Sequence, residues 1–313
     1  MEKLSYNLIV DDQKEFANLL PDLKINDEAL PEFRVGIVDM LRGFFPEQKT
    51  HGERVFLGED VSLLIYKPSQ QQNNTKLPVI YYIHGGGYIS GNADMYSFRH
   101  QERADKLDVI VVAIEYRLAP EFPFPTPLQD CLKGLEWLYE SLKLLGADKD
   151  RITIMGESAG GGLAAALNLY IKDKTEYRPK NQILIYPMID YKTSLDPENY
   201  PNKYVGEYLW THHLNQYAWK ALQGSFDIPE DQLGYFSPSY AKDLTGLPPT
   251  YMMVGSLDLF FEEDMQYAIG LVRSGVPVTL DLVQGVIHAF DMVLTETSSE
   301  YNDRLHSVLQ KVI

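Results

Sequence analysis

The sequence is poor in cysteine and has no long hydrophobic run. A single cysteine, Cys131, among 313 residues excludes an internal disulfide and a cysteine-rich zinc site. The longest uninterrupted aliphatic run, residues 109–114, is far too short to span a bilayer. The start of the chain has acidic residues where a signal peptide has a cationic and then an apolar stretch. We therefore expect a cytoplasmic protein without stable membrane association, in which Cys131 is a small core residue.

The sequence also lacks an excess of basic residues. Its 28 Lys and Arg are outnumbered by 44 Asp and Glu, which gives a net charge of −16. A surface of this sign repels phosphate backbones, so we expect no nucleic-acid partner. Hydrophobic residues make up 45% of the chain, and no internal repeat is present, which indicates one large globular unit.

Short apolar runs alternate with segments of helical period along most of the chain. The clearest helical segment, residues 127–145, carries a leucine-rich stripe and is followed by Gly146, a common helix stop. Residues 54–67 predict an antiparallel hairpin. Strands and helices in alternation predict an α/β fold, with a mostly parallel central sheet and helices on both faces. The apolar runs that we expect to be strands are 79–83, 109–114, 152–155, 183–186, 251–254 and 278–283.

Two regions interrupt this alternation. Residues 1–50 are amphipathic, and the aromatic-rich stretch at about 190–240 contains no obvious parallel strand. We expect both to be additions to a catalytic domain that spans residues 51–313. They should lie over one edge of the sheet, where ligands bind beyond the carboxyl ends of the strands.

The sharpest short motif is Gly156-Glu157-Ser158-Ala159-Gly160, which stands between a predicted strand and a small-residue helix at 161–171. A nucleophile elbow needs this context, because the strand turns so tightly into the helix that the serine takes a strained conformation. Glycines on either side remove the Cβ atoms that would collide. The motif predicts that Ser158 is a nucleophile.

A second motif, His84-Gly85-Gly86-Gly87, ends the predicted strand at 79–83. Three glycines leave backbone N–H groups uncovered, and these could join the N–H of Ala159 in binding a developing oxyanion. A flexible turn or a phosphate-binding loop is the alternative. The phosphate alternative is weak because neither a GK[ST] sequence nor a G-x-G-x-x-G motif accompanies the glycines.

A nucleophilic serine needs a histidine and an acid, which follow it along the chain in this architecture. His288 follows the last predicted strand through a loop, whereas His306 lies in a terminal helix, and His212 and His213 are neighbours that cannot share a target. Asp258 follows the predicted strand at 251–254.

The other acids near Asp258 fit this role less well. Asp281 lies within the last strand, and Glu262, Glu263 and Asp264 have the pattern of an acidic first helical turn. Ser158, Asp258 and His288 therefore predict an acyl-enzyme mechanism. Since the chain has no metal-ligand spacing and no nucleotide motif, we expect neither a metal nor another cofactor.

Together these residues resemble the bacterial hormone-sensitive-lipase-like family of α/β-hydrolases, which includes many short-chain carboxylesterases and acetyl esterases. The resemblance covers roughly residues 77–290. It departs from the family pattern at Glu157, where Asp or Thr is more usual, at Leu259, where proline often follows the acid, and at Ala289, where Gly is common. The matching signatures are His84-Gly85-Gly86-Gly87-Tyr88, Tyr116-Arg117-Leu118-Ala119-Pro120-Glu121, Gly156-Glu157-Ser158-Ala159-Gly160, Asp258 and His288-Ala289-Phe290.

The resemblance implies an α/β-hydrolase fold with a helical cap, built from the N-terminal helices and the insertion at about 190–240. It implies Ser158, Asp258 and His288 as the catalytic triad, and Gly85, Gly86 and Ala159 as the oxyanion hole. Ordinary packing is the more frequent role of any single aromatic residue. The candidates for substrate binding are Gly87, Tyr88, Glu157 and Trp210.

The predicted function is that of a serine carboxylesterase acting on small esters with short acyl chains. Two alternatives stay open. One is an amide or N-acyl hydrolase of the formamidase or deacetylase type, and the other is a non-catalytic ligand-binding receptor on the same fold. Retention of His288 disfavours the receptor, because receptors related to this family lack the catalytic histidine. A small-molecule ester is the expected partner, and the sequence leaves a homo-oligomer open.

Overall fold

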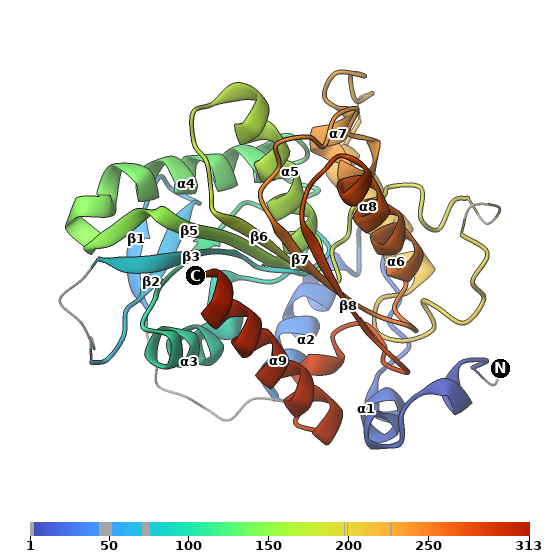
Figure 1. The fold of residues 1–313 in the computed structure, drawn as a ribbon. Coiled ribbons are helices and arrows are strands. Elements are labelled where there is room, and N and C mark those ends of the chain that lie inside the picture. The colour runs from blue at the N-terminus through green and yellow to red at the C-terminus, as the bar shows by residue number, and fades with distance from the viewer. Residues whose placement is uncertain (1–2, 44–51, 71–75, 197, 199, 226) are drawn as a thin grey trace.

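An eight-stranded sheet runs through the centre of the protein (Figure 1). The structure is a computed structural model, and it describes residues 3–43, 52–70, 76–196, 198, 200–225 and 227–313. Strand β2 is antiparallel to both β1 and β4, and the pairs from β4 through β3, β5, β6 and β7 to β8 are parallel. The strand order is β1-β2-β4-β3-β5-β6-β7-β8. The strands are β1 (Glu53–Phe56), β2 (Ser62–Tyr66), β3 (Leu77–Ile83), β4 (Ile110–Glu115), β5 (Ala147–Glu157), β6 (Asn181–Ile185), β7 (Thr250–Gly255) and β8 (Val278–Val283).

The predicted fold class is confirmed. Every apolar run of the sequence forms a strand. Strands β3, β4, β6 and β7 are buried along almost their entire length and β5 is buried from Ile152 onward, as continuous apolar runs in a parallel sheet require. The predicted hairpin is present as the antiparallel pair β1 and β2. The sheet is therefore an α/β-hydrolase sheet with one antiparallel end.

Helices cover both faces of the sheet (Figure 1). The α-helices are α1 (Lys14–Leu19), α2 (Leu30–Gly43), α3 (Ser97–Leu107), α4 (Thr126–Leu145), α5 (Ala159–Lys174), α6 (His212–Gln223), α7 (Leu233–Phe236), α8 (Phe261–Arg273) and α9 (Glu296–Val312). Short 3₁₀ helices are η1 (Tyr6–Leu8), η2 (Asp11–Gln13), η3 (Ala93–Tyr96), η4 (Pro238–Tyr240) and η5 (Phe290–Met292).

Alternate residues of the strands separate the core into two parts. On β3, Tyr81 and Ile83 pack into the part that contains α4, α5 and α8, whereas Ile80 and Tyr82 pack into the part that contains α3 and α9. Cys131 on α4 is fully buried in the first part, as predicted. Helix α4 ends at Gly146, which takes a left-handed conformation with φ 68°.

The two regions that interrupt the alternation meet at one place. Leu23 and Phe33, from the N-terminal region, line the same cavity as Leu209 and Trp210 from the stretch at about 190–240. Arg34 on α2 adds polar contacts, because its guanidinium group donates to the backbone oxygens of Ile89 and Ala119 and to both oxygens of Glu121. Residues 1–2, 44–50, 197, 199 and 226 of these two regions lie outside the described residues.

Within the described ranges, no helix combines the length and the apolar character that crossing a bilayer requires.

Candidate active site

Ser158 sits at a sharp turn between β5 and α5. Its φ of 56° and ψ of −123° form a strained conformation for a residue with a Cβ atom. Its N–H donates to the oxygen of Ile185, 2.9 Å away, which ties the turn to β6. Gly160 is required here, because a Cβ atom at that position would lie 2.1 Å from the backbone oxygen of Ile83. This is the geometry of a nucleophile elbow.

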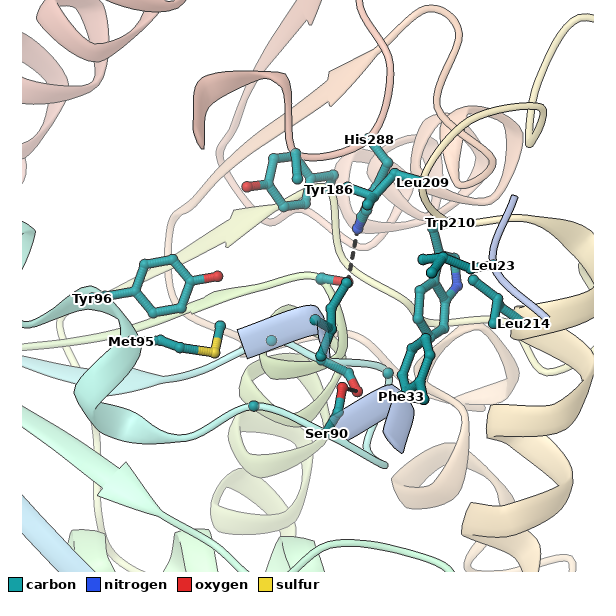
Figure 2. Close-up of a pocket in the computed structure, with 17 residues that line it drawn as sticks. Leu23, Phe33, Ser90, Met95, Tyr96, Tyr186, Leu209, Trp210, Leu214 and His288 are labelled. Atoms are coloured by element: carbon teal, nitrogen blue, oxygen red, sulfur yellow. Dashed lines mark hydrogen bonds between the residues drawn. The ribbon is translucent and has the colours of Figure 1, made fainter. Parts of the chain in front are cut away.

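The structure brings His288 and Asp258 to Ser158, and Figure 2 shows the imidazole of His288 among the side chains that line the pocket. Nε2 of His288 lies 3.0 Å from Oγ of Ser158, and Nδ1 lies 2.7 Å from Oδ2 of Asp258. The other carboxylate oxygen, Oδ1, accepts a hydrogen bond from the N–H of Phe260. All three side chains are buried, and they come from the carboxyl ends of β5, β7 and β8. A hydrogen-bonded chain thus connects an acid, an imidazole and a hydroxyl.

Aromatic rings hold the imidazole of His288 from two further sides. The ring of Phe260 stands edge-on to it at 5.2 Å, and that of Tyr186 packs against it at 4.7 Å. The imidazole therefore has little freedom to rotate away from Ser158.

The glycine loop after β3 lies beside the elbow. Gly86 has φ +117°, and a Cβ atom there would lie 2.1 Å from the backbone oxygen of Ser90, so only glycine fits. Gly85 and Gly86 line the cavity next to Ser158. Ala159 is the first residue of α5, so its N–H has no partner within that helix. Gly85 and Gly86 therefore lie beside Ser158, and Ala159 follows Ser158 directly in the chain.

His84, which precedes the glycines, supports the loop from behind. Its ring stacks on that of Tyr116 at 4.2 Å, and the Tyr116 hydroxyl donates to the backbone oxygen of His84. Complete burial lowers the pKa of His84 to about 4, so the ring is neutral at neutral pH. A neutral ring adds no charge beside the glycine loop.

A small apolar cavity of about 50 Å³ opens at Ser158 and His288. Gly87 and Trp210, two of the predicted binding residues, line it, and they touch: a Cβ atom on Gly87 would lie 2.0 Å from the indole. The sequence did not predict most of the other residues that line the cavity. Only the amphipathic pattern around residue 33 indicated that this segment packs near the site. The missed lining side chains are Leu23, Phe33, Ile37, Ser90, Met95, Tyr96, Tyr186, Leu209, Leu214 and Ala289.

Tyr88 and Glu157, the other two predicted binding residues, are not among the residues that line this cavity. The Tyr88 hydroxyl donates to the backbone oxygen of Met188, and its ring packs on Trp219. Glu157 is buried and forms an ion pair with Arg103 on α3. The residue before the nucleophile alternates to the opposite face of the sheet, so its side chain points away from the cavity.

The acids that begin α8 are more deeply buried than their pattern suggested. Glu263 accepts hydrogen bonds from the N–H groups of Ile189 and Asp190 and from the Thr193 hydroxyl. It therefore fixes the chain just after β6. Asp264 is fully buried, and among the described residues neither of its carboxylate oxygens has a hydrogen-bond partner.

We expect Asp264→Ala to stabilise the protein. Burial, together with the carboxylates of Glu263 and Asp258, raises the pKa of Asp264 well above its ordinary value. The folded state therefore binds a proton that the unfolded state releases above about pH 4, and this difference destabilises the fold as the pH rises. Removing the unpartnered group should increase the free energy of unfolding by about 1–3 kcal/mol at pH 7, and by less near pH 4.

Urea denaturation of the wild type and the variant at pH 7 and pH 4.5 measures this effect. Glu300→Ala, which removes an exposed acid from α9, should leave the free energy of unfolding nearly unchanged and serves as the control. A lower stability of Asp264→Ala at pH 7 would mean that the carboxyl group makes a favourable contact in the fold.

Across the ranges given above, no three His, Cys, Asp or Glu side chains are grouped so that they could hold a metal ion.

Comparison with known proteins identifies the family. The sequence matches the α/β hydrolase fold family over residues 80–292. The chain therefore belongs to this family, and the resemblance to its hormone-sensitive-lipase-like members is confirmed. The predicted enzyme class, that of the serine ester hydrolases, is confirmed for the family.

Individual relatives carry more specific names. The chain is 31% identical to ethyl acetate hydrolase of Pseudomonas putida, over 74% of this chain and 72% of that protein. It is 28% identical to arylacetamide deacetylase of Bos taurus, over 88% of this chain and 85% of that protein. Among solved structures, a bacterial heroin esterase superposes with a TM-score of 0.87 at 28% identity, covering 98% of both chains.

Proposed function

We propose that the protein is a serine carboxylesterase that hydrolyses small esters with short acyl chains through an acyl-enzyme. The observation that carries this proposal is the unbroken chain of hydrogen bonds from Asp258 through His288 to Ser158, next to the glycine loop. No part of that chain needs to move before it can transfer a proton.

In this mechanism His288 accepts the Ser158 proton at Nε2 while Oγ attacks the ester carbonyl carbon. The N–H groups of Gly85, Gly86 and Ala159 stabilise the negative charge that develops on the carbonyl oxygen. His288 then returns the proton to the leaving alcohol, and Asp258 stabilises the imidazolium that forms in between. Water then attacks the acyl carbon while the same imidazole takes its proton. The imidazolium returns this proton to Oγ of Ser158 as the bond between Oγ and the acyl carbon breaks and the carboxylic acid leaves.

The cavity supports a short acyl chain. Its volume of about 50 Å³ is that of a few water molecules, since a cavity needs roughly 10–15 Å³ to hold one. A short acyl group fits such a space, and its mostly apolar walls provide no charged partner for a charged acyl group. The name of the ethyl acetate hydrolase relative points in the same direction.

We also propose that residues 1–50 and the insertion at about 190–240 form a cap over this cavity, with residues 51–313 as the catalytic domain. The contributions of Leu23 and Phe33 from the first region, and of Leu209 and Trp210 from the second, support this division. The cap would set the depth of the cavity and limit the entry of water.

A series of p-nitrophenyl esters from acetate to decanoate tests the proposed substrate class. We expect kcat/KM to be highest between acetate and hexanoate and to fall by about 5-fold to 150-fold for the longest chains. This range follows from the roughly 1–3 kcal/mol that extra methylenes cost when forced against a packed wall. A flat profile up to decanoate would contradict a short-chain site, and no hydrolysis of any ester would favour the receptor alternative.

Amide hydrolysis is a second candidate, because one relative is named as an arylacetamide deacetylase. The same acyl group on two leaving groups separates the candidates. For each substrate, the enzymatic rate is divided by the rate of the uncatalysed reaction. We expect this rate enhancement to be larger for p-nitrophenyl acetate than for p-nitroacetanilide. A reversed preference would reassign the protein to amides.

A further inference from the structure

Helix α3 carries two buried arginines on one face. Arg99 and Arg103 are four residues apart, and their side chains therefore project from the same side of the helix. Both are buried, in the part of the core that lies on the opposite face of the sheet from α4 and α5. Each reaches a buried carboxylate close to the catalytic residues in the sequence.

Arg99 binds the segment that follows His288. Its Nη1 donates to Oδ2 of Asp291 at 2.7 Å, and its Nη2 donates to the backbone oxygen of the same residue. Oδ1 of Asp291 accepts a hydrogen bond from the Tyr186 hydroxyl at 2.7 Å. Tyr186 is the residue whose ring packs against the His288 imidazole. Asp291 is therefore connected to His288 both along the chain and through a ring.

Arg103 binds the residue that precedes Ser158. Its Nη2 lies 3.4 Å from Oε1 of Glu157, the last residue of β5. Burial raises the pKa of Glu157, and the nearby positive charge of Arg103 opposes that rise. The same helix face thus contacts the nucleophile elbow and the histidine loop.

Stability alone does not explain this arrangement. Taking four charged groups out of water costs several kcal/mol per ion, and apolar residues of similar volume usually stabilise a core at least as well. What buried ion pairs supply is direction, since guanidinium and carboxylate groups bind at fixed angles and distances. Such groups are suited to holding two loops in register.

We propose that α3 is a brace for the catalytic residues: Arg99 with Asp291 and Arg103 with Glu157 are positioning pairs that fix His288 relative to Ser158. The proposal rests on the proposed function, because it assigns a role in the proton transfer between these two side chains. None of these four side chains is among the residues that line the cavity. Tyr186, which donates to Asp291, does line it. The brace therefore controls turnover rather than substrate binding.

The test uses two variants that keep the size of the side chain. Asp291→Asn removes the charge that Arg99 binds, and Tyr186→Phe removes only the hydroxyl that reaches Asp291. Each has a matched control elsewhere. Asp130→Asn removes the charge of a buried carboxylate whose two oxygens accept hydrogen bonds from the Arg117 guanidinium. Tyr251→Phe removes the hydroxyl that donates to Asp281.

We expect the brace variants to lower kcat by about tenfold to hundredfold, as a small misplacement of reacting groups does, and to change KM by less than about twofold. The controls should keep kcat within about twofold. Active sites are counted by titration with a p-nitrophenyl phosphonate, so that loss of folded protein does not enter kcat. Arg99→Lys, which keeps the charge, should retain more activity than Arg99→Met.

The two positioning pairs should also depend on each other. If both fix the same distance, Glu157→Gln combined with Asp291→Asn should lower kcat by less than the product of the two single effects. Independent, multiplicative effects would mean that the pairs act on separate features of the site and would overturn the single brace.

Two results separate failure of the brace from failure of the proposed function. A wild type that hydrolyses esters, with Asp291→Asn at full kcat per titrated site, would overturn the brace alone. Should the wild type hydrolyse no ester, the proposed function fails. The brace is then tested by NMR, through the low-field resonance of the proton in the His288–Asp258 hydrogen bond. This resonance should lose intensity in Asp291→Asn but not in Asp130→Asn. An unchanged resonance overturns the brace.

Discussion

Replacing Ser158 with alanine is expected to lower kcat for p-nitrophenyl acetate by about 10⁴-fold or more without unfolding the protein. The hydroxyl is the group that His288 faces, at 3.0 Å from Nε2. Alanine also carries a Cβ atom, so it occupies the position at φ 56° with no strain beyond that of serine. The hydrolysis that remains should reflect only binding of the ester beside the oxyanion donors.

Ser90 is the informative comparison, because it lines the same cavity. Its Oγ donates to the backbone oxygen of Gly86 at 2.9 Å, so it supports the glycine loop rather than facing the imidazole. Ser90→Ala should lower kcat by about tenfold or less, the effect of a lost loop contact. A phosphonate inhibitor should add its mass to the wild type and to Ser90→Ala but not to Ser158→Ala. Labelling of Ser158→Ala would assign the nucleophile elsewhere.

The residues that sequence reasoning placed correctly are those whose surroundings are local. The segments around Gly86 and Gly160 tolerate no Cβ atom, and that restriction is visible in the sequence as glycine. The strands are equally local, because a run such as residues 79–83 must be buried on both faces of the sheet wherever it pairs. Asp258 and His288 follow strand ends, and the carboxyl ends of parallel strands meet at one edge.

The errors concern side chains whose surroundings come from distant segments. Glu157 carries a charge next to the nucleophile, but the strand turns it toward Arg103, 54 positions earlier in the chain. Phe33 lines the cavity although 125 positions separate it from Ser158. Asp264 lies in an acidic first turn, which is typical of a solvated helix start, yet the packing of α8 buries it completely. No local pattern reports such contacts.

Asp258→Asn is expected to lower kcat by about 10⁴-fold, the second of the two largest effects. In the wild type, Oδ2 of Asp258 accepts the Nδ1 proton of His288 at 2.7 Å, which leaves Nε2 free to accept the Ser158 proton. Oδ1 already accepts the N–H of Phe260. In the variant, the amide oxygen would keep the bond to Phe260 and the NH₂ group would face the imidazole.

An NH₂ group donates and cannot accept, so the imidazole would place its proton on Nε2 and point it at Ser158. The base is then in the wrong tautomer, while the size and shape of the site are unchanged. We therefore expect KM to stay within about threefold and activity to recover partly at high pH, where hydroxide can replace the lost base. Asp281→Asn is the control, since that carboxylate binds Tyr251 and Arg304 instead.

The pattern across these variants decides what Asp258 does. If it only oriented the imidazole, the rings of Tyr186 and Phe260 would hold the same orientation without it, and Asp258→Asn would lose little more than Asp281→Asn. The contacts argue otherwise, because aromatic rings restrict the tilt of the imidazole but do not distinguish its two tautomers. Only an acceptor at Nδ1 does, and across the described part of the chain the hydrogen bond made by Nδ1 goes to Asp258. A small loss of kcat in Asp258→Asn would therefore mean that a group other than Asp258 accepts the Nδ1 proton.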